Sequence, residues 1–313
     1  MKTKLKSTIS AACHSFVSVV YAGAVLLIAS SVQAQNLFEA DWNSGNIYEF
    51  TPDGVKSTFA SGLFNPTGLA FDGAGNLFVG EINTWDIIKI TPDGVKSVFT
   101  SGLSSPWGMA FNSVGDLFVA NYVANSITKI TPDGVQSTFA SGLSRPIGLA
   151  FNSAGNLFEI DSGSGNIYEF TSGGVQSTFA SGLLNTPKEL AFNSAGDLFV
   201  SGYHADFYGA MGYIYKYTPG GEQSTFYSGS VNPQGLAFNS AGDLLVSVAV
   251  FSSGYIYEYT PGGTQSIFAS GLDKPHGLAF QGVVLPVPEP SALVLLAVGA
   301  TALLVRRRRN LAA

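Results

Sequence analysis

Short runs of apolar and aromatic residues alternate with clusters of turn-forming residues along most of the chain. Between residues 147 and 181 these runs are IGLAF, LFEID, GNIYEF and VQSTFAS. Aromatic and β-branched residues favour strands, whereas the Asn, Gly, Pro, Asp and Ser between the runs favour turns. No helical period of 3.6 residues interrupts the pattern. This stretch therefore predicts four strands joined by short turns.

The same unit occurs six times. The turn sequence TPDG and its variants TSGG and TPGG begin at Thr51, Thr91, Thr131, Thr171, Thr218 and Thr260. GLAF, or a near variant of it, ends at Phe71, Phe111, Phe151, Phe192, Phe238 and Phe280. Four strands in about 40 residues are typical of one blade of a β-propeller.

The two ends of the repeat array complement each other. The array begins with NLFEAD, a second strand without its first, and ends with KPHGLAF, a first strand without followers. Joined, they form one blade from three N-terminal strands and one C-terminal strand, which leaves no open sheet edge. The sequence predicts an all-β fold, a six-bladed β-propeller over residues 35–282.

The first 34 residues have the layout of a secretory signal peptide. A basic start precedes an apolar segment, residues 16–29, and small residues follow at the −3 and −1 positions of a cleavage site. The residues concerned are Lys2, Lys4, Lys6, Val32 and Ala34. We expect cleavage after Ala34, and the alternative is a retained membrane anchor.

The C-terminal end predicts a second membrane element. A linker, residues 283–290, leads into an apolar helix over residues 291–305, which is short for a bilayer of about 30 Å. A basic tail, residues 306–313, follows and should stay cytoplasmic. The pattern predicts a single transmembrane helix with the propeller outside.

This order of features resembles the PEP-CTERM sorting signal of Gram-negative bacteria. The residues that carry the resemblance are Val287, Pro288, Glu289, Pro290, Arg306, Arg307, Arg308 and Arg309. It implies export through the secretion translocon, transient anchoring in the inner membrane, and removal of the tail by an exosortase during transfer to the cell surface or the medium. A permanent tail anchor is the alternative.

Charge separates the body from the two ends. The chain carries a net charge of −6, but residues 35–286 hold 8 basic against 20 acidic side chains. An acidic body repels phosphates, which excludes nucleic acid as a partner. The one cysteine, Cys13, lies in the predicted signal peptide, so the propeller has no disulfide.

The repeat resembles NHL-type repeats and the related gluconolactonase and streptogramin-lyase propellers, through the pattern P-x-G-[LM]-A-F, G-[ND]-L-F-V and T-P-x-G. Gluconolactonase-like enzymes carry metal ligands just before the P-x-G glycine. The equivalents here are Thr67, Trp107, Ile147, Lys188, Gln234 and His276. None is a carboxylate, and a hard cation needs several oxygen ligands, so we expect no metal or other cofactor there.

Streptogramin-lyase chemistry requires histidines together with metal-binding acids. The predicted mature chain has two histidines, His204 and His276, in different loops, and no histidine accompanies Glu81. Enzymatic activity is therefore uncertain, and the sequence favours a protein that is not an enzyme.

One polar position recurs at the end of the second strand of four consecutive units. Its residues are Asp41, Glu81, Asn121 and Asp161, hereafter the polar set. They predict a shallow site for Ca²⁺ or sugar hydroxyls. The alternative is that these side chains cap the following loops.

The fifth unit carries about six extra residues within SGYHADFYGAMG, residues 201–212. We expect a loop on the same face as the polar set, because insertions in repeats map to loops. Its candidate binding residues are Tyr203, His204, Asp206 and Tyr208, and His276 joins them from the sixth unit. The repeated Asn112, Asn152, Asn193 and Asn239 are expected in structural hairpin turns on the opposite face.

Three functions remain open on this evidence. The leading hypothesis is a non-enzymatic propeller that binds an extracellular polysaccharide, matrix component or surface protein through the loop face. The alternatives are a metal-dependent hydrolase or lyase and a structural matrix protein.

Overall fold

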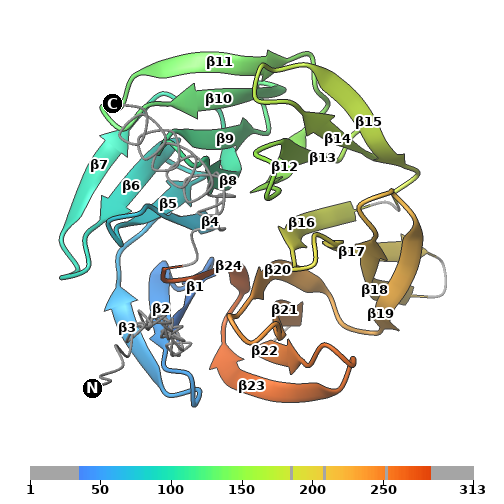
Figure 1. Ribbon diagram of the computed structural model, residues 1–313. Coiled ribbons are helices and arrows are strands. Elements are labelled where there is room, and N and C mark those ends of the chain that lie inside the picture. Colours follow the sequence, from blue (N-terminus) through green and yellow to red (C-terminus); the bar gives the residue numbers. More distant parts are fainter. Residues whose placement is uncertain (1–34, 184–185, 207–208, 251–252, 283–313) are drawn as a thin grey trace, which may run out of the picture. The chain divides into compact units, whose positions relative to one another are not determined.

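The computed structural model describes residues 35–183, 186–206, 209–250 and 253–282. These residues form six four-stranded antiparallel sheets arranged as the blades of a propeller (Figure 1). The predicted fold is therefore confirmed. The described residues include no helix that is long and apolar enough to cross a bilayer. The predicted signal peptide, PEP motif and transmembrane helix all lie outside the described residues.

Each blade contributes one innermost strand to the centre and one strand to the rim. Blade A contains β24 (Pro275–Phe280), β1 (Leu37–Asp41), β2 (Asn46–Phe50) and β3 (Lys56–Ala60). Blade B contains β4 (Pro66–Phe71), β5 (Leu77–Glu81), β6 (Asp86–Ile90) and β7 (Lys96–Thr100). Blade C contains β8 (Pro106–Phe111), β9 (Leu117–Asn121), β10 (Ser126–Ile130) and β11 (Gln136–Ser141).

The remaining three blades follow in chain order. Blade D contains β12 (Pro146–Phe151), β13 (Leu157–Asp161), β14 (Asn166–Phe170) and β15 (Gln176–Ser181). Blade E contains β16 (Thr186–Phe192), β17 (Leu198–Asp206), β18 (Gly209–Tyr217) and β19 (Gln223–Gly229). Blade F contains β20 (Pro233–Phe238), β21 (Leu244–Val250), β22 (Ser253–Tyr259) and β23 (Gln265–Leu272).

Blade A closes the propeller as the sequence predicts. The C-terminal strand β24 pairs with β1 in antiparallel register, with Leu37 opposite Phe280 and Phe38 opposite Ala279. The innermost strand β24 in turn packs between β20 and β4. The pairing thus joins the two ends of the propeller and covers the edge that β1 would otherwise expose.

Neighbouring innermost strands approach each other so closely that most of them need a glycine as their third residue. A Cβ atom on Gly108 would lie well under 3.0 Å from the carbonyl oxygen of Ile147, and one on Gly235 would meet that of His276 in the same way. Blade E departs from the pattern, because Glu189 occupies the position of the glycine.

Phenylalanine side chains hold neighbouring blades together. Phe118, on β9, lies edge-to-face with Phe139 of its own blade at 4.9 Å and with Phe151 of the next blade at 5.1 Å. Equivalent triplets are centred on Phe38, Phe78, Phe158 and Phe199. Such pairs contribute about 0.5–1.5 kcal/mol each beyond their buried area.

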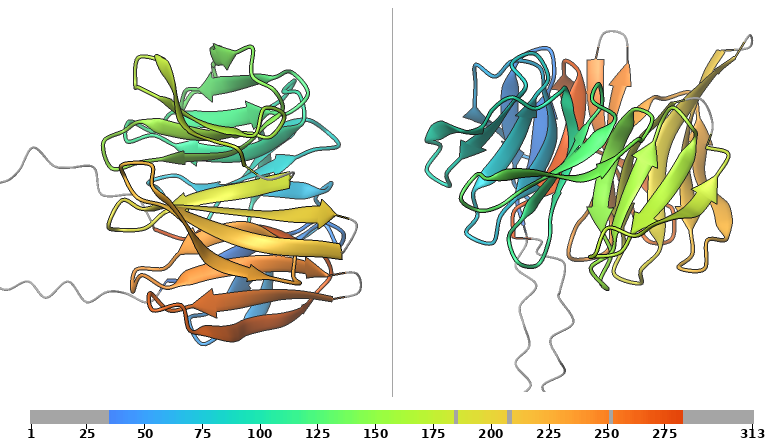
Figure 2. Two further views of the ribbon diagram at one scale, coloured as in Figure 1. Left: turned by 90° about the vertical axis from the view of Figure 1, so that its right-hand side faces the viewer. Right: turned by 90° about the horizontal axis from the view of Figure 1, so that it is seen from above.

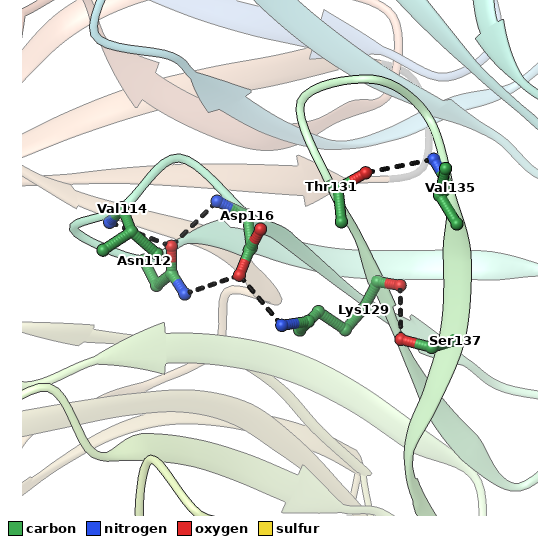
Figure 3. A network of polar contacts seen from close by, with 7 residues as sticks. All are labelled: Asn112, Val114, Asp116, Lys129, Thr131, Val135 and Ser137. Carbon is green, nitrogen blue, oxygen red and sulfur yellow. Dashed lines mark hydrogen bonds and ion pairs between the residues drawn. The ribbon is translucent and has the colours of Figure 1, made fainter.

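The hairpin turns between first and second strands are built alike. The Oδ1 atom of Asn112 accepts hydrogen bonds from the backbone N–H groups of Val114 and Asp116, at 3.1 and 2.8 Å (Figure 3). Lys129 forms an ion pair of 3.0 Å with Asp116. Asn152, Asn193 and Asn239 bind their turns in the same way.

The insertion in the fifth unit differs from its prediction. Its described residues lengthen β17 and β18 to nine residues each, with Tyr203 opposite Gly212 and His204 opposite Met211. The result is a long hairpin that projects from the propeller, as the neighbouring hairpin of β21 and β22 also does (Figure 2). Cross-strand pairing of a β-prone sequence provides the physical reason, since it satisfies backbone groups that a loop would leave to water.

Candidate functional site

The channel between the innermost strands has two different ends. At the loop face lie the starts of the innermost strands and the connections from second to third strands; at the turn face lie the ends of the innermost strands and the asparagine turns. The turn face opens into a cavity of about 900 Å³, lined mainly by the Phe and Ala side chains that end the innermost strands. At the loop face, the lining of the channel instead includes the polar side chains of Lys188, Glu189, Gln234 and His276.

The polar set lies at the loop face, in equivalent positions of four blades. Each member stands opposite the first proline of its innermost strand, as Glu81 does to Pro66 and Asp161 does to Pro146. All four side chains are buried, with at most 4% of each exposed.

Hydrogen bonds explain why these four buried side chains are polar. Glu81 accepts from the backbone N–H of Phe64 at 2.9 Å and from the hydroxyl of Thr84 at 2.8 Å. Asp161 accepts from the N–H groups of Ser144 and Ser164 at 2.6 and 2.9 Å. Asp41 and Asn121 also accept from the loop that precedes their innermost strand. These side chains therefore cap loops, which was the alternative to a Ca²⁺ or sugar site in the sequence analysis.

A cluster of aromatic rings surrounds the channel at the loop face. The ring centroid of His276 lies 5.5 Å from that of Trp42 and 5.3 Å from that of Trp107. Trp107 is also 6.1 Å from Trp42 and 5.7 Å from Tyr122. These rings come from blades A and C, which flank blade B.

Two lysines complete the cluster. The Nζ atom of Lys188 lies 5.5 Å from the ring centroid of Tyr203 and 6.0 Å from that of Trp107. The Nζ atom of Lys274 lies 5.1 Å from the ring centroid of Trp42. We call the seven residues the mouth: Trp42, Trp107, Tyr122, Lys188, Tyr203, Lys274 and His276.

The repeat explains how the mouth is assembled. Trp42, Tyr122 and Tyr203 each follow directly the residue that stands opposite the proline of their blade. Trp107, Lys188 and His276 each precede the glycine position of an innermost strand. Two positions of the repeat therefore supply six of the seven side chains.

A small cavity lies at the channel entrance beside the mouth. Its volume is about 10 Å³, and its lining includes Lys188, Glu189, Gln234 and His276. A space of this size admits at most a single water molecule. A larger molecule therefore cannot enter the channel at this end.

Burial changes the ionisation of the groups around this cavity. Burial raises the pKa of Glu189 to about 8, although the carboxylate accepts a hydrogen bond from the N–H of Leu190. Burial and the charges of Lys188 and Lys274 lower the pKa of His276 to about 3. Burial, and then the charge of Lys274, lowers the pKa of Lys188. At neutral pH the glutamic acid is largely protonated and the imidazole is uncharged.

Two further buried glutamates lie between blades. Glu39 and Glu159 stand where the other blades carry Val79, Val119, Val200 and Val246. Both carboxylate oxygens of Glu159 and the Oε2 atom of Glu39 lack a hydrogen-bond partner among the described residues. Burial, and then the neighbouring Asp161 or Asp41, raises the pKa of each glutamate well above its ordinary value.

The structure separates the predicted site residues into three groups. Tyr203 and His276 belong to the mouth, whereas the four members of the polar set are buried loop caps. His204 lies on β17 and Asp206 ends it, and Tyr208 lies outside the described residues. Sequence reasoning missed five members of this cluster, namely Trp42, Trp107, Tyr122, Lys188 and Lys274. All of them except Lys274 could have been found by comparing, across the six units, the residue that follows the second strand with the residue before the glycine position.

Within the described ranges, no three His, Cys, Asp or Glu side chains are grouped so that they could hold a metal ion. The side-chain oxygens of the polar set accept hydrogen bonds from four different loops, and these bonds do not converge on one point where an ion could bind.

Comparisons with known proteins bear on the tail and on the fold. Residues 286–309 match the PEP-CTERM protein-sorting motif. No curated protein matches the chain. The motif implies an exported, exosortase-sorted protein of the cell surface.

Solved propellers are similar in fold. A nidogen/laminin complex includes a chain that is 18% identical, with a TM-score of 0.68 over 79% of this chain and 98% of that one. A virginiamycin B lyase from Staphylococcus aureus, solved with quinupristin, is 16% identical, with a TM-score of 0.59 over 80% and 94%. A proposed gluconolactonase is 16% identical, with a TM-score of 0.57 over 71% and 87%. At these identities the likeness concerns the fold alone.

The class of protein follows from these findings together. The chain is an exosortase-sorted PEP-CTERM protein whose body is a six-bladed β-propeller.

Proposed function

We propose that this protein is a non-enzymatic binding module that presents its mouth to a saccharide outside the cell. One observation carries the proposal, namely that Trp42, Trp107, Tyr122 and Tyr203 gather at a single opening of the propeller. Tryptophan and tyrosine offer apolar faces for a sugar ring and polar edges for its hydroxyls. The narrow cavity beside them keeps a bound sugar at the surface.

The same site gives little support to a lyase or hydrolase. Glu189 and His276 could exchange protons in principle, and both line the small cavity at the channel entrance. A cavity of about 10 Å³ cannot admit the reacting atoms of a substrate between them. The binding module therefore fits the geometry better than an enzyme.

Glycan binding tests the proposal. The full chain, solubilised in detergent, is applied to a glycan array, and the best saccharide is then titrated by calorimetry. Trp107→Ala and Tyr203→Ala should each weaken binding by about 1–3 kcal/mol, as modest hot spots do. The matched control is Trp85→Ala, because Trp85 is on the same face, 48% exposed and outside the mouth. Equal losses in all three variants would contradict the proposal.

Processing of the tail is tested separately. Replacing Pro288, Glu289 and Pro290 by alanine should leave export intact and block removal of the C-terminal segment by the sorting enzyme. Mass spectrometry of the protein from its native host measures the C-terminus. Release of the variant as efficiently as the wild type would show that the anchor is handled in another way.

A further inference from the structure

The two lysines of the mouth have no counter-ion in the part of the chain that the structure describes. Among the described residues neither Lys188 nor Lys274 forms an ion pair or a hydrogen bond, and each lies against aromatic rings. Lys188 is partly buried, whereas Lys274 is exposed. An ammonium group that leaves water without a charged partner loses solvation that ring faces replace only in part.

Two other lysines of the propeller form ion pairs, whereas the ammonium group of Lys89, like those of the mouth, lies only against an aromatic ring among the described residues. Lys129 and Lys216 form ion pairs with Asp116 and Asp197, at 3.0 and 2.7 Å. Lys56 donates to the carbonyl oxygen of Gly271 at 3.2 Å. Lys188 and Lys274 differ from Lys89 in that they lie close enough together for the charge of Lys274 to lower the pKa of Lys188.

The acids near the mouth are engaged elsewhere. Both carboxylate oxygens of Asp41 accept backbone N–H groups, from Ser44 and Asp273. The side chain of Asp273 accepts a hydrogen bond from Asn43 at 3.2 Å. Glu189 is mostly protonated at neutral pH, because burial raises its pKa to about 8. Among the described residues, none of these groups forms an ion pair with Lys188 or Lys274.

The two ammonium groups also repel each other. The charge of Lys274 helps to lower the pKa of Lys188, and both charges help to lower that of His276. Residues 35–286 hold only 8 basic side chains, and two of them lie close together without an ion pair to any residue that the structure describes. A negative charge bound beside both would relieve this repulsion and compensate for the lost solvation of Lys188.

We propose that the mouth binds an anionic sugar unit of the hexuronic acid class, whose carboxylate pairs with Lys188 and Lys274 while its ring stacks on the neighbouring aromatic side chains. Each ammonium group lies beside an aromatic face, so the anion must be attached to a group with an apolar surface of its own. A sugar acid has this combination, and a free inorganic anion does not. The inference rests on the proposed saccharide binding and narrows it to one chemical class.

Calorimetry of the full chain in detergent tests the inference with four probes. These are trigalacturonic acid, its methyl ester, a sulfated galactose trisaccharide and inorganic phosphate. Trigalacturonic acid should bind at least tenfold more tightly than its neutral ester. Lys188→Met and Lys274→Met should each weaken its binding about 10- to 100-fold, the loss expected for a charge-assisted contact. Neither substitution should change affinity for the ester by more than about threefold.

Two further variants separate a charge effect from a structural one. Lys188→Arg should retain affinity within about threefold, because it restores the charge. Lys89→Met is the matched control, since the Lys89 ammonium also lies over an aromatic ring, at 5.7 Å from Phe78, but outside the mouth. It should leave binding unchanged.

The outcomes distinguish this inference from the proposal on which it rests. Equal binding of the acid and its ester, with loss in Trp107→Ala, would overturn the anionic class and leave saccharide binding standing. If the sulfated sugar or phosphate bound more tightly than trigalacturonic acid, the claim that the ligand's anionic group is a carboxylate would be wrong. Binding of none of the saccharides would overturn both.

Discussion

The two ends of the propeller channel are built from the same six repeats but differ in how uniform they are. At the turn face, Asn112, Asn152, Asn193 and Asn239 accept the same pair of backbone hydrogen bonds, and Phe ends every innermost strand. At the loop face, the residue before the glycine position is Thr, Trp, Ile, Lys, Gln or His.

This contrast separates positions that build the fold from positions that are free to vary. A turn must satisfy its backbone groups in every blade, so one solution recurs. The residues that point into the mouth satisfy no repeated backbone requirement, and their chemistry can differ from blade to blade. The loop face is therefore where a specific ligand could be recognised, while its buried polar set remains part of the scaffold.

The largest effect is expected where the six repeats meet most closely. Gly108→Ala should lower the free energy of unfolding by about 3 kcal/mol, because the new Cβ would collide with the backbone of Ile147. Urea denaturation measures the change. The control Gly73→Ala places its Cβ in open space and should cost less than about 0.5 kcal/mol. Similar midpoints for the two variants would contradict the close approach of the innermost strands.

A smaller loss should follow when a loop cap of the polar set is removed. Glu81→Ala leaves the N–H of Phe64 without its acceptor and should destabilise the fold by about 2 kcal/mol. Thermal and urea unfolding measure this loss. Addition of Ca²⁺ should not raise the melting temperature of either protein, as it would if the polar set bound the ion in the folded state.

Glu159→Val should act in the opposite direction. The substitution replaces a buried carboxylate without partners by the residue of the equivalent blades, and should stabilise the fold by about 1–2 kcal/mol. Because burial raises the pKa of Glu159, the folded state keeps a proton that the unfolded state releases. Stability from this group is thus complete below about pH 4.5 and is lost as the pH rises.

Unfolding at pH 5 and pH 8 checks the sign. The gain from Glu159→Val should be larger at pH 8, and the wild type should lose stability over this interval. Glu189, whose pKa lies at about 8, adds to the same loss. A gain that is larger at pH 5 would mean that the carboxylate is charged and stabilised in the folded state.

The smallest effect is expected at a single turn. Asn152→Ala removes two acceptor contacts, to the N–H groups of Ala154 and Asn156, and should cost about 1 kcal/mol. Binding at the mouth should stay unchanged, because the turn lies at the opposite end of the channel. Calorimetry with a bound saccharide tests this, and weaker binding in Asn152→Ala alone would place the ligand at the turn face.

Much of the fold could be predicted from the sequence because its determinants are local and repeated. Strand residues and turn residues alternate in each unit, and the incomplete units at both ends can form only one joined blade. The insertion was harder to predict, since extension of β17 and β18 depends on pairing between Tyr203 and Gly212 across the hairpin.

The mouth could be predicted only in part. Tyr203 and His276 were expected at the loop face, but Trp42 and Lys274 are separated by more than 200 residues and meet only when blade A closes. Trp107 and Lys188 occupy a position that was considered for metal ligands alone, so their aromatic and cationic chemistry was overlooked. Such clusters depend on the arrangement of blades, which no single repeat encodes.

The pairing of β24 with β1 also sets the order of events during folding. Strands β1 to β3 are among the first parts of the propeller to cross the membrane during export. The strand that pairs with β1 is β24, which ends at Phe280, more than 200 residues later. Non-local contacts of this kind form slowly, because a long loop must close before they can stabilise the chain. Blade A therefore stays incomplete until almost the whole chain has crossed the membrane, and a chain truncated before Pro275 would keep β1 exposed to other strands.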